Sequence, residues 1–172
     1  GPLRRMQGTI GSTGAKTADM GALTRAQELK AAGASADEIY AQTRWWLDHP
    51  DGRPRFEIDD SAANMGDLRT LGDIQPGPLG ASLNHDELYK AYPDTKRIEL
   101  FGQEGYGGHY DQAANRIHAS NQSVTLHEGQ HAIQGREGMA RGGSPEMFSG
   151  VPEEIVRIEY KKDIIGRLRN LK

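Results

Sequence analysis

The spacing of apolar residues predicts a helix over residues 123–137. Leu126 and Ile133 lie seven positions apart, so both fall on one face of such a helix. Gly135 and Gly138 are expected to end it, because glycine readily adopts the left-handed conformation that closes a helix C-terminus. The apolar face should pack on a core while the polar face is turned toward a cleft.

A second apolar pattern with helical spacing lies near the end of the chain. Its aliphatic members are Ile155, Ile158, Ile165 and Leu168. They predict a last helix over residues 152–171, and Glu153 and Glu154 favour its N-terminus through the helix dipole.

Two short helices are expected nearer the start, over residues 25–32 and 36–43. Thr24–Gln27 and Ser35–Glu38 each fit a capping box, in which the first side chain accepts a backbone hydrogen bond at the start of a helix. Gly33 separates the two helices.

The first 21 residues carry no such pattern. They begin with Gly-Pro-Leu, which is typical of the remnant of a cleaved expression tag, and they are rich in glycine and threonine. We therefore expect a disordered segment over residues 1–21 and a single domain over residues 22–172.

Strand patterns predict two β-hairpins. In the first, Trp45–Leu47 and Arg55–Ile58 are joined across Asp51–Gly52, a pair typical of tight turns. The second joins His109–Asp111 to Arg116–Ala119 and directly precedes the helix predicted over residues 123–137. An edge strand in that place could bind a peptide backbone by strand addition.

The remaining segments complete the picture of an α+β domain. Lys96–Phe101 is expected to be a strand, Asp86–Ala91 a short helix stopped by Pro93, and the glycine- and proline-rich stretch Gly72–Leu83 a surface loop. The expected fold class is α+β, with short hairpins and a mixed sheet beside the helix of residues 123–137.

The composition limits which metal ligands and which partners the chain can have. The 172 residues have a net charge of −3 and contain no cysteine, so disulfides are excluded and any metal must be bound by nitrogen and oxygen ligands. The near-neutral charge argues against nucleic acid as a partner. Since no apolar run approaches the roughly 18 residues of a membrane-spanning helix, we expect no membrane association.

The helix expected over residues 123–137 carries the sequence His127-Glu128-x-x-His131. Positions four apart lie on the same face of a helix, so two imidazole nitrogens can converge on one ion, and Zn²⁺ is the natural occupant. Glu128 lies about a hundred degrees around the helix from His127, where a carboxylate reaches a metal-bound water rather than the metal. The pattern is typical of zinc peptidases, with Glu128 as the catalytic general base.

Several motifs along the chain together resemble one protein family. They include Asp51-Gly52-Arg53-Pro54-Arg55-Phe56-Glu57-Ile58-Asp59-Asp60, Leu71-Gly72-Asp73-Ile74, Glu87-Leu88-Tyr89-Lys90-Ala91-Tyr92-Pro93 and the stretch from Leu126 to Gly143. Over residues 24–147 the chain resembles the large polyvalent protein-associated domain of type 23, found in multidomain proteins of phages and conjugative elements. The resemblance implies a zincin-like metallopeptidase module of a larger protein, in the cytoplasm or delivered into a host or recipient cell.

A catalytic zinc site needs a third protein ligand beside the two histidines. We expect Glu159, because Glu159-x-x-x-Asp163 resembles the Glu-x-x-x-Asp of gluzincins. Glu137 is an alternative, since it lies six residues after His131, where metzincins carry their third histidine, and Glu154 is another. A ligand beyond the end of this sequence is the remaining alternative.

Two functions fit these observations. The first is a zinc metallopeptidase that acts on a protein or peptide. The second is a non-catalytic interaction or structural module in which the histidine pair is a vestigial or structural metal site. His109 and His118 of the second hairpin could also be metal ligands, but they are expected to be cross-strand partners or solvent-facing side chains.

Overall fold

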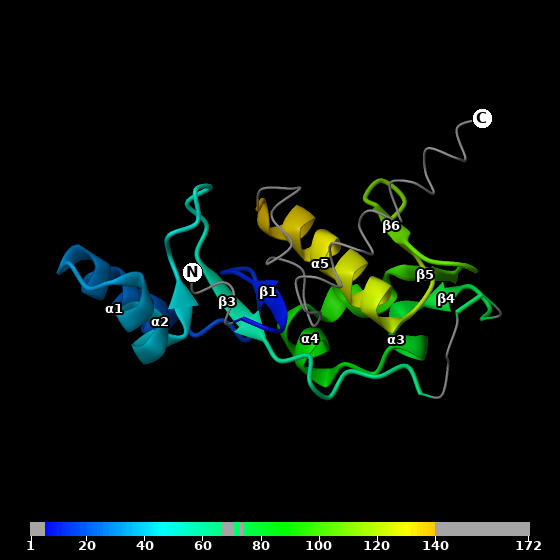
Figure 1. Ribbon diagram of the computed structural model, residues 1–172, viewed down its shortest axis with the longest axis horizontal. Helices are drawn as coiled ribbons and strands as arrows, with labels where there is room; N and C mark the ends of the chain where they lie inside the picture. The colour runs from blue at the N-terminus through cyan, green and yellow to red at the C-terminus, as the bar shows by residue number, and fades with distance from the viewer. Residues whose placement is uncertain (1–5, 67–70, 73, 140–172) are drawn as a thin grey trace.

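The computed structural model describes residues 6–66, 71–72 and 74–139, which form an α+β fold with two small sheets and five α-helices (Figure 1). The expected fold class is confirmed. Within the described residues, no helix is both long and apolar enough to cross a membrane. The helix predicted over residues 152–171 lies outside the described part of the chain.

The first sheet is antiparallel, with strand order β1-β3-β2. It consists of β1 (Thr9–Gly11), β2 (Trp45–Trp46) and β3 (Arg55–Ile58). The pairing of β2 with β3 confirms the first predicted hairpin, and Gly52 has the positive φ of 74° expected in its connection.

The exclusion of residues 1–21 from the fold is wrong for the described residues 6–21. All three residues of β1 are buried, and β1 pairs with β3 along its whole length. Three residues are too few to show a strand periodicity. Gly8, just before β1, allows the chain to approach the backbone of β3 closely. A Cβ atom on this residue would lie only 2.0 Å from the carbonyl oxygen of Ile58.

Helices α1 (Met20–Ala31) and α2 (Ala36–Thr43) lie together at one end of the fold (Figure 1). Ser35 caps α2 as predicted, because its side chain accepts from the backbone N–H of Glu38. The predicted cap of α1 at Thr24 is wrong: Asp19 caps the helix instead, and α1 begins at Met20, earlier than the predicted range of 25–32.

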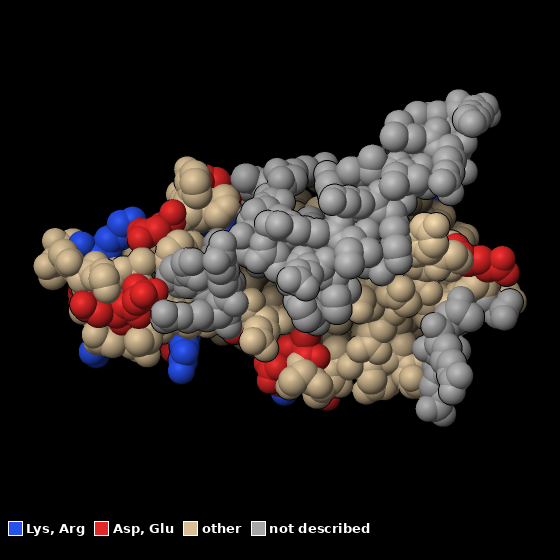
Figure 2. All heavy atoms as spheres, viewed as in Figure 1, with Lys and Arg blue, Asp and Glu red and all other residues tan. Residues whose placement is uncertain are grey.

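The surface around α1 and α2 carries both signs of charge. Figure 2 shows acidic and basic side chains interspersed over this end of the molecule, on the face that it displays. Such mixing agrees with the small net charge of −3 of the whole chain.

The second sheet is mixed and has the strand order β4-β5-β7-β6. Its strands are β4 (Gly77–Pro78), β5 (Glu99–Gly102), β6 (Gly108–Asp111) and β7 (Arg116–Ala119). β6 and β7 form the second predicted hairpin, while β5 and β7 run parallel. Among the described strands, β6 therefore lies at an edge of this sheet.

The expectation of a surface loop over Gly72–Leu83 is wrong for its second half. That half contains β4 and a single-turn helix, α3 (Leu79–Ser82). Leu79 and Leu83 are four residues apart and both are buried, so their burial in the core outweighs the breaker residues around them.

The segment that leads into β5 agrees partly with expectation. Helix α4 (Asp86–Ala91) is confirmed with its predicted bounds. Pro93–Arg97 then form the 3-10 helix η2, so β5 begins later than the strand predicted from Lys96.

Helix α5 (Gln122–Glu137) packs on the second sheet and confirms the helix predicted over residues 123–137. Asn121 caps its start, and Gly138, with a φ of 65°, ends it. Leu126 and Ile133 are both buried in the main core, as their spacing predicts.

The other side of α5 contacts β1 through a buried glutamine. The backbone N–H of Ile10 donates to Gln130 Oε1 at 2.6 Å, and Gln130 Nε2 donates to the carbonyl oxygen of Ile10 at 2.9 Å. This amide therefore bonds the edge of β1 as a neighbouring strand would. The N-terminal segment is thereby tied to the helix that carries both histidines.

Replacing Gln130 with leucine should lower the free energy of unfolding by about 2–4 kcal/mol, because both backbone groups of Ile10 would be left buried without their partner. Urea denaturation measures the change. Gln42→Leu is the matched control, since Gln42 is exposed and accepts from the exposed Arg25; its effect should stay within about 0.5 kcal/mol. Equal effects of the two variants would contradict the role assigned to Gln130.

Candidate metal centre

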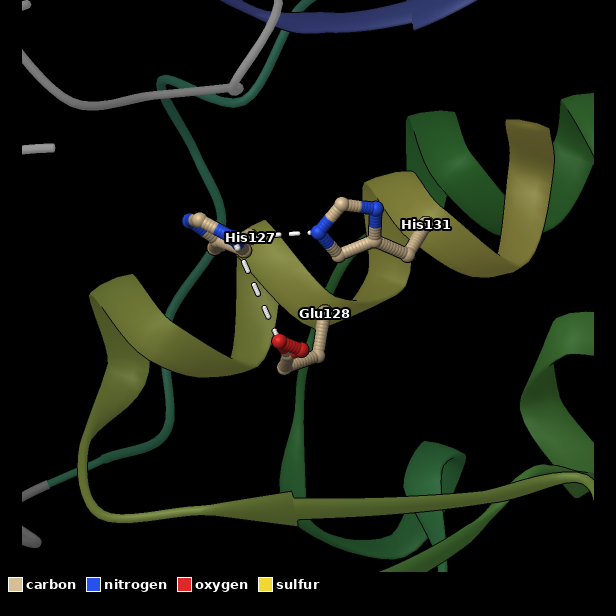
Figure 3. A group of neighbouring side chains, drawn as sticks. All are labelled: His127, Glu128 and His131. Carbon is tan, nitrogen blue, oxygen red and sulfur yellow. Dashed lines mark hydrogen bonds and ion pairs between the residues drawn. The ribbon is translucent and has the colours of Figure 1, made fainter. Parts of the chain in front are cut away.

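The two predicted metal-binding histidines point toward each other from one face of α5 (Figure 3). The Nε2 atoms of His127 and His131 are 3.2 Å apart. Their positions follow from the helix itself, because residues four apart lie one turn above each other. The side chains are mostly buried, with His127 only 12% exposed.

The separation of the two nitrogens fits a zinc ion. Two nitrogens that each lie about 2.0–2.1 Å from Zn²⁺ at a tetrahedral angle are about 3.3 Å apart. His127 and His131 have this spacing, and together with a carboxylate oxygen of Glu128 their donor atoms lie within 4.8 Å of one another. The described residues thus bring all three members of the predicted motif into one group.

Glu128 lies beside the pair, buried at 3% exposure. Its Oε1 atom is 4.0 Å from Nε2 of His127 (Figure 3). A carboxylate this close to the histidine pair can reach either a bound metal or a water on it. The role of Glu128 as the general base stays a prediction from the sequence.

Gln134 joins this group, although the sequence reasoning missed it. Its Oε1 atom is 2.9 Å from Nδ1 of His131, on the side of the ring away from His127. Residues three apart on a helix are neighbours, so the spacing of His131 and Gln134 was the available signal.

Glu137, one of the alternatives for the third ligand, has a different role. Its carboxylate accepts two hydrogen bonds from the backbone N–H of Gly14, at 2.8 and 3.0 Å, and one from the hydroxyl of Tyr92 at 2.6 Å. Arg53 Nη2 lies 3.5 Å away. The Glu137 oxygens thus bind the N-terminal segment and Tyr92, and among the described residues Glu137 is not part of the group formed by His127, Glu128 and His131.

Burial and the hydrogen bond to Glu137 raise the pKa of Tyr92 well above its ordinary value. The phenol therefore stays protonated and donates to the carboxylate. The hydroxyl oxygen in turn accepts from the backbone N–H of Ser12 at 3.0 Å. This network makes a second link between the N-terminal segment and α5.

The other two alternatives for the third ligand, Glu159 and Glu154, lie outside the described residues. A role for Glu159 as the third ligand stays a prediction from the sequence.

His109 and His118 are cross-strand partners, as expected. They are paired across β6 and β7, with ring centroids 4.4 Å apart, and His118 also stacks on Phe101 of β5. A Cβ atom on Gly108 would lie 2.6 Å from Val124 of α5, so Gly108 faces that helix and His109 the opposite side of the sheet. Partial burial is the main cause that lowers the pKa of His118, and the charges of the nearby His109 and Arg116 lower it further.

The chain matches a known protein family over part of its length. The family model described as Large polyvalent protein associated domain 23 matches residues 8–66. No curated protein and no solved structure matches the chain. The matched range starts earlier than the resemblance expected over residues 24–147 and ends before α5.

The matched residues contain β1, α1, α2, β2 and β3, whereas His127, Glu128 and His131 lie outside them. The resemblance expected from the sequence is therefore confirmed over residues 8–66, where the chain matches Large polyvalent protein associated domain 23.

Proposed function

We propose that the chain is a zinc-dependent metallopeptidase in which His127 and His131 bind the ion and Glu128 is the general base. The observation that carries the proposal is the 3.2 Å separation of the two Nε2 atoms on one face of α5, with the Glu128 carboxylate beside them. The substrate class is a protein or peptide, as the motif and the family resemblance suggest.

The side chains have distinct parts in this proposal. When bound, zinc supplies polarisation of a peptide carbonyl and lowers the pKa of a water toward about 7. Glu128 accepts a proton from the attacking water and returns it to the leaving amine.

The third ligand follows from the sequence in this proposal. Glu159 completes the site in this proposal, because Glu159-x-x-x-Asp163 resembles the Glu-x-x-x-Asp of gluzincins. With His127 and His131, Glu159 gives the two-histidine, one-glutamate ligand set of several zinc peptidases.

We predict about one zinc ion per chain in protein purified without a nickel column. His127→Ala and His131→Ala should each remove most of it, because one imidazole alone binds zinc weakly. Elemental analysis by mass spectrometry measures the content.

Two control variants sharpen the zinc measurement. His109→Ala removes a histidine on the opposite side of the sheet, and Glu137→Gln alters a carboxylate engaged elsewhere, so both should keep their zinc. Retention of zinc by His127→Ala and His131→Ala would show that the ion binds at another place.

Glu128→Gln should keep the fold and the zinc while slowing hydrolysis by about 10²–10⁴-fold, because glutamine cannot accept the proton. Cleavage is measured on a mixture of peptides by mass spectrometry, which detects new termini. A glutamine variant with undiminished turnover would rule out the proposed role. Zinc-loaded wild-type protein that cleaves no peptide would favour the non-catalytic interaction module.

A further inference from the structure

Gln134 is fully buried at 0% exposure on the same helix as the metal pair. Its amide oxygen, Oε1, lies 2.9 Å from Nδ1 of His131. Within the described residues its amide nitrogen has no hydrogen-bond partner. One end of this buried amide is thus engaged with a predicted metal ligand and the other is not satisfied.

The direction of this hydrogen bond follows from the chemistry of the two groups. With the amide oxygen facing the ring, Nδ1 of His131 carries the proton and donates it, because an amide oxygen can only accept. In neutral imidazole the other nitrogen then carries a lone pair. That nitrogen is Nε2, which lies 3.2 Å from Nε2 of His127 and is the atom that a metal would contact.

Gln130, one turn earlier on α5, shows how the amide of Gln134 differs from a purely structural one. Gln130 is equally buried, but both ends of its amide bond the backbone of Ile10. Gln130 therefore has a structural role that uses the whole amide. Gln134 uses only its oxygen, and a methionine of similar length would fill the same space without burying an unsatisfied donor.

We propose that Gln134 is a positioning residue that fixes the ring orientation and tautomer of His131, so that Nε2 is presented to the metal. The inference rests on the proposed function, because it concerns the same metal pair. Hydrogen bonds from the second ring nitrogen of a ligand histidine are a general means of orienting the ring and raising its basicity. Loss of such a partner usually lowers metal affinity by about 10–100-fold.

The test compares wild type with Gln134→Met and Gln134→Glu in two measurements. Long-range ¹H–¹⁵N NMR spectra of the metal-free proteins identify which nitrogen of His131 carries the proton. Competition with a chelator gives the zinc affinity. Gln134→Met should lose the uniform Nδ1–H tautomer and bind zinc about 10–100-fold more weakly, while its resistance to urea stays at or above that of wild type.

Gln134→Glu should keep both the Nδ1–H tautomer of His131 and the zinc affinity of wild type, since a carboxylate oxygen also accepts from Nδ1–H. Gln42→Met, at an exposed position, is the control that should change neither. A purely structural role would instead appear as lower stability of Gln134→Met with an unchanged His131 tautomer, and that result would overturn the inference.

The two proposals can fail separately. If wild type binds zinc and Gln134→Met binds it equally well, the positioning role is wrong and the proposed function stands. An Nε2–H tautomer of His131 in metal-free wild type would also overturn the inference alone. If wild type binds no zinc, both the positioning role and the proposed function are wrong.

Discussion

The buried polar contacts between α5 and the N-terminal segment are the constraint on which the rest of the described fold depends. Gln130 bonds both backbone groups of Ile10, and the Glu137 carboxylate accepts from Gly14 and Tyr92. On its other side the helix packs its apolar residues against the second sheet. Two different kinds of surface therefore hold α5: one apolar, the other made of buried hydrogen bonds that are costly to leave unmade.

This arrangement explains how a helix with many polar residues can be so thoroughly buried. Gln130, Gln134 and Glu137 are all buried, and the Gln130 amide, the Gln134 amide oxygen and the Glu137 carboxylate make specific contacts instead of facing water. A helix fixed along its length can hold two side chains in one geometry, which is what a metal site requires. The residues matched by the family model supply part of that support, because they contain Ile10 and Gly14.

The elements that could be predicted are those whose signals are local. The bounds of α4, the cap at Gly138 and the pairing of His127 with His131 each depend on residues a few positions apart. β1 could not be predicted, since its contact with Gln130 joins residues 120 positions apart and its pairing uses backbone groups that any sequence has. The role of Glu137 was missed for the same reason, because its partner Gly14 carries no side chain to signal the contact.

We propose that His127 and His131 together bind one zinc ion, with Glu128 beside the ion and not bonded to it. Anomalous diffraction at the zinc absorption edge, from crystals of the zinc-loaded protein, locates the ion. We expect one peak about 2.0–2.1 Å from Nε2 of each histidine, with the Glu128 oxygens beyond bonding distance. A peak elsewhere, for example between His109 and His118, or a Glu128 carboxylate bonded directly to the ion, would contradict it.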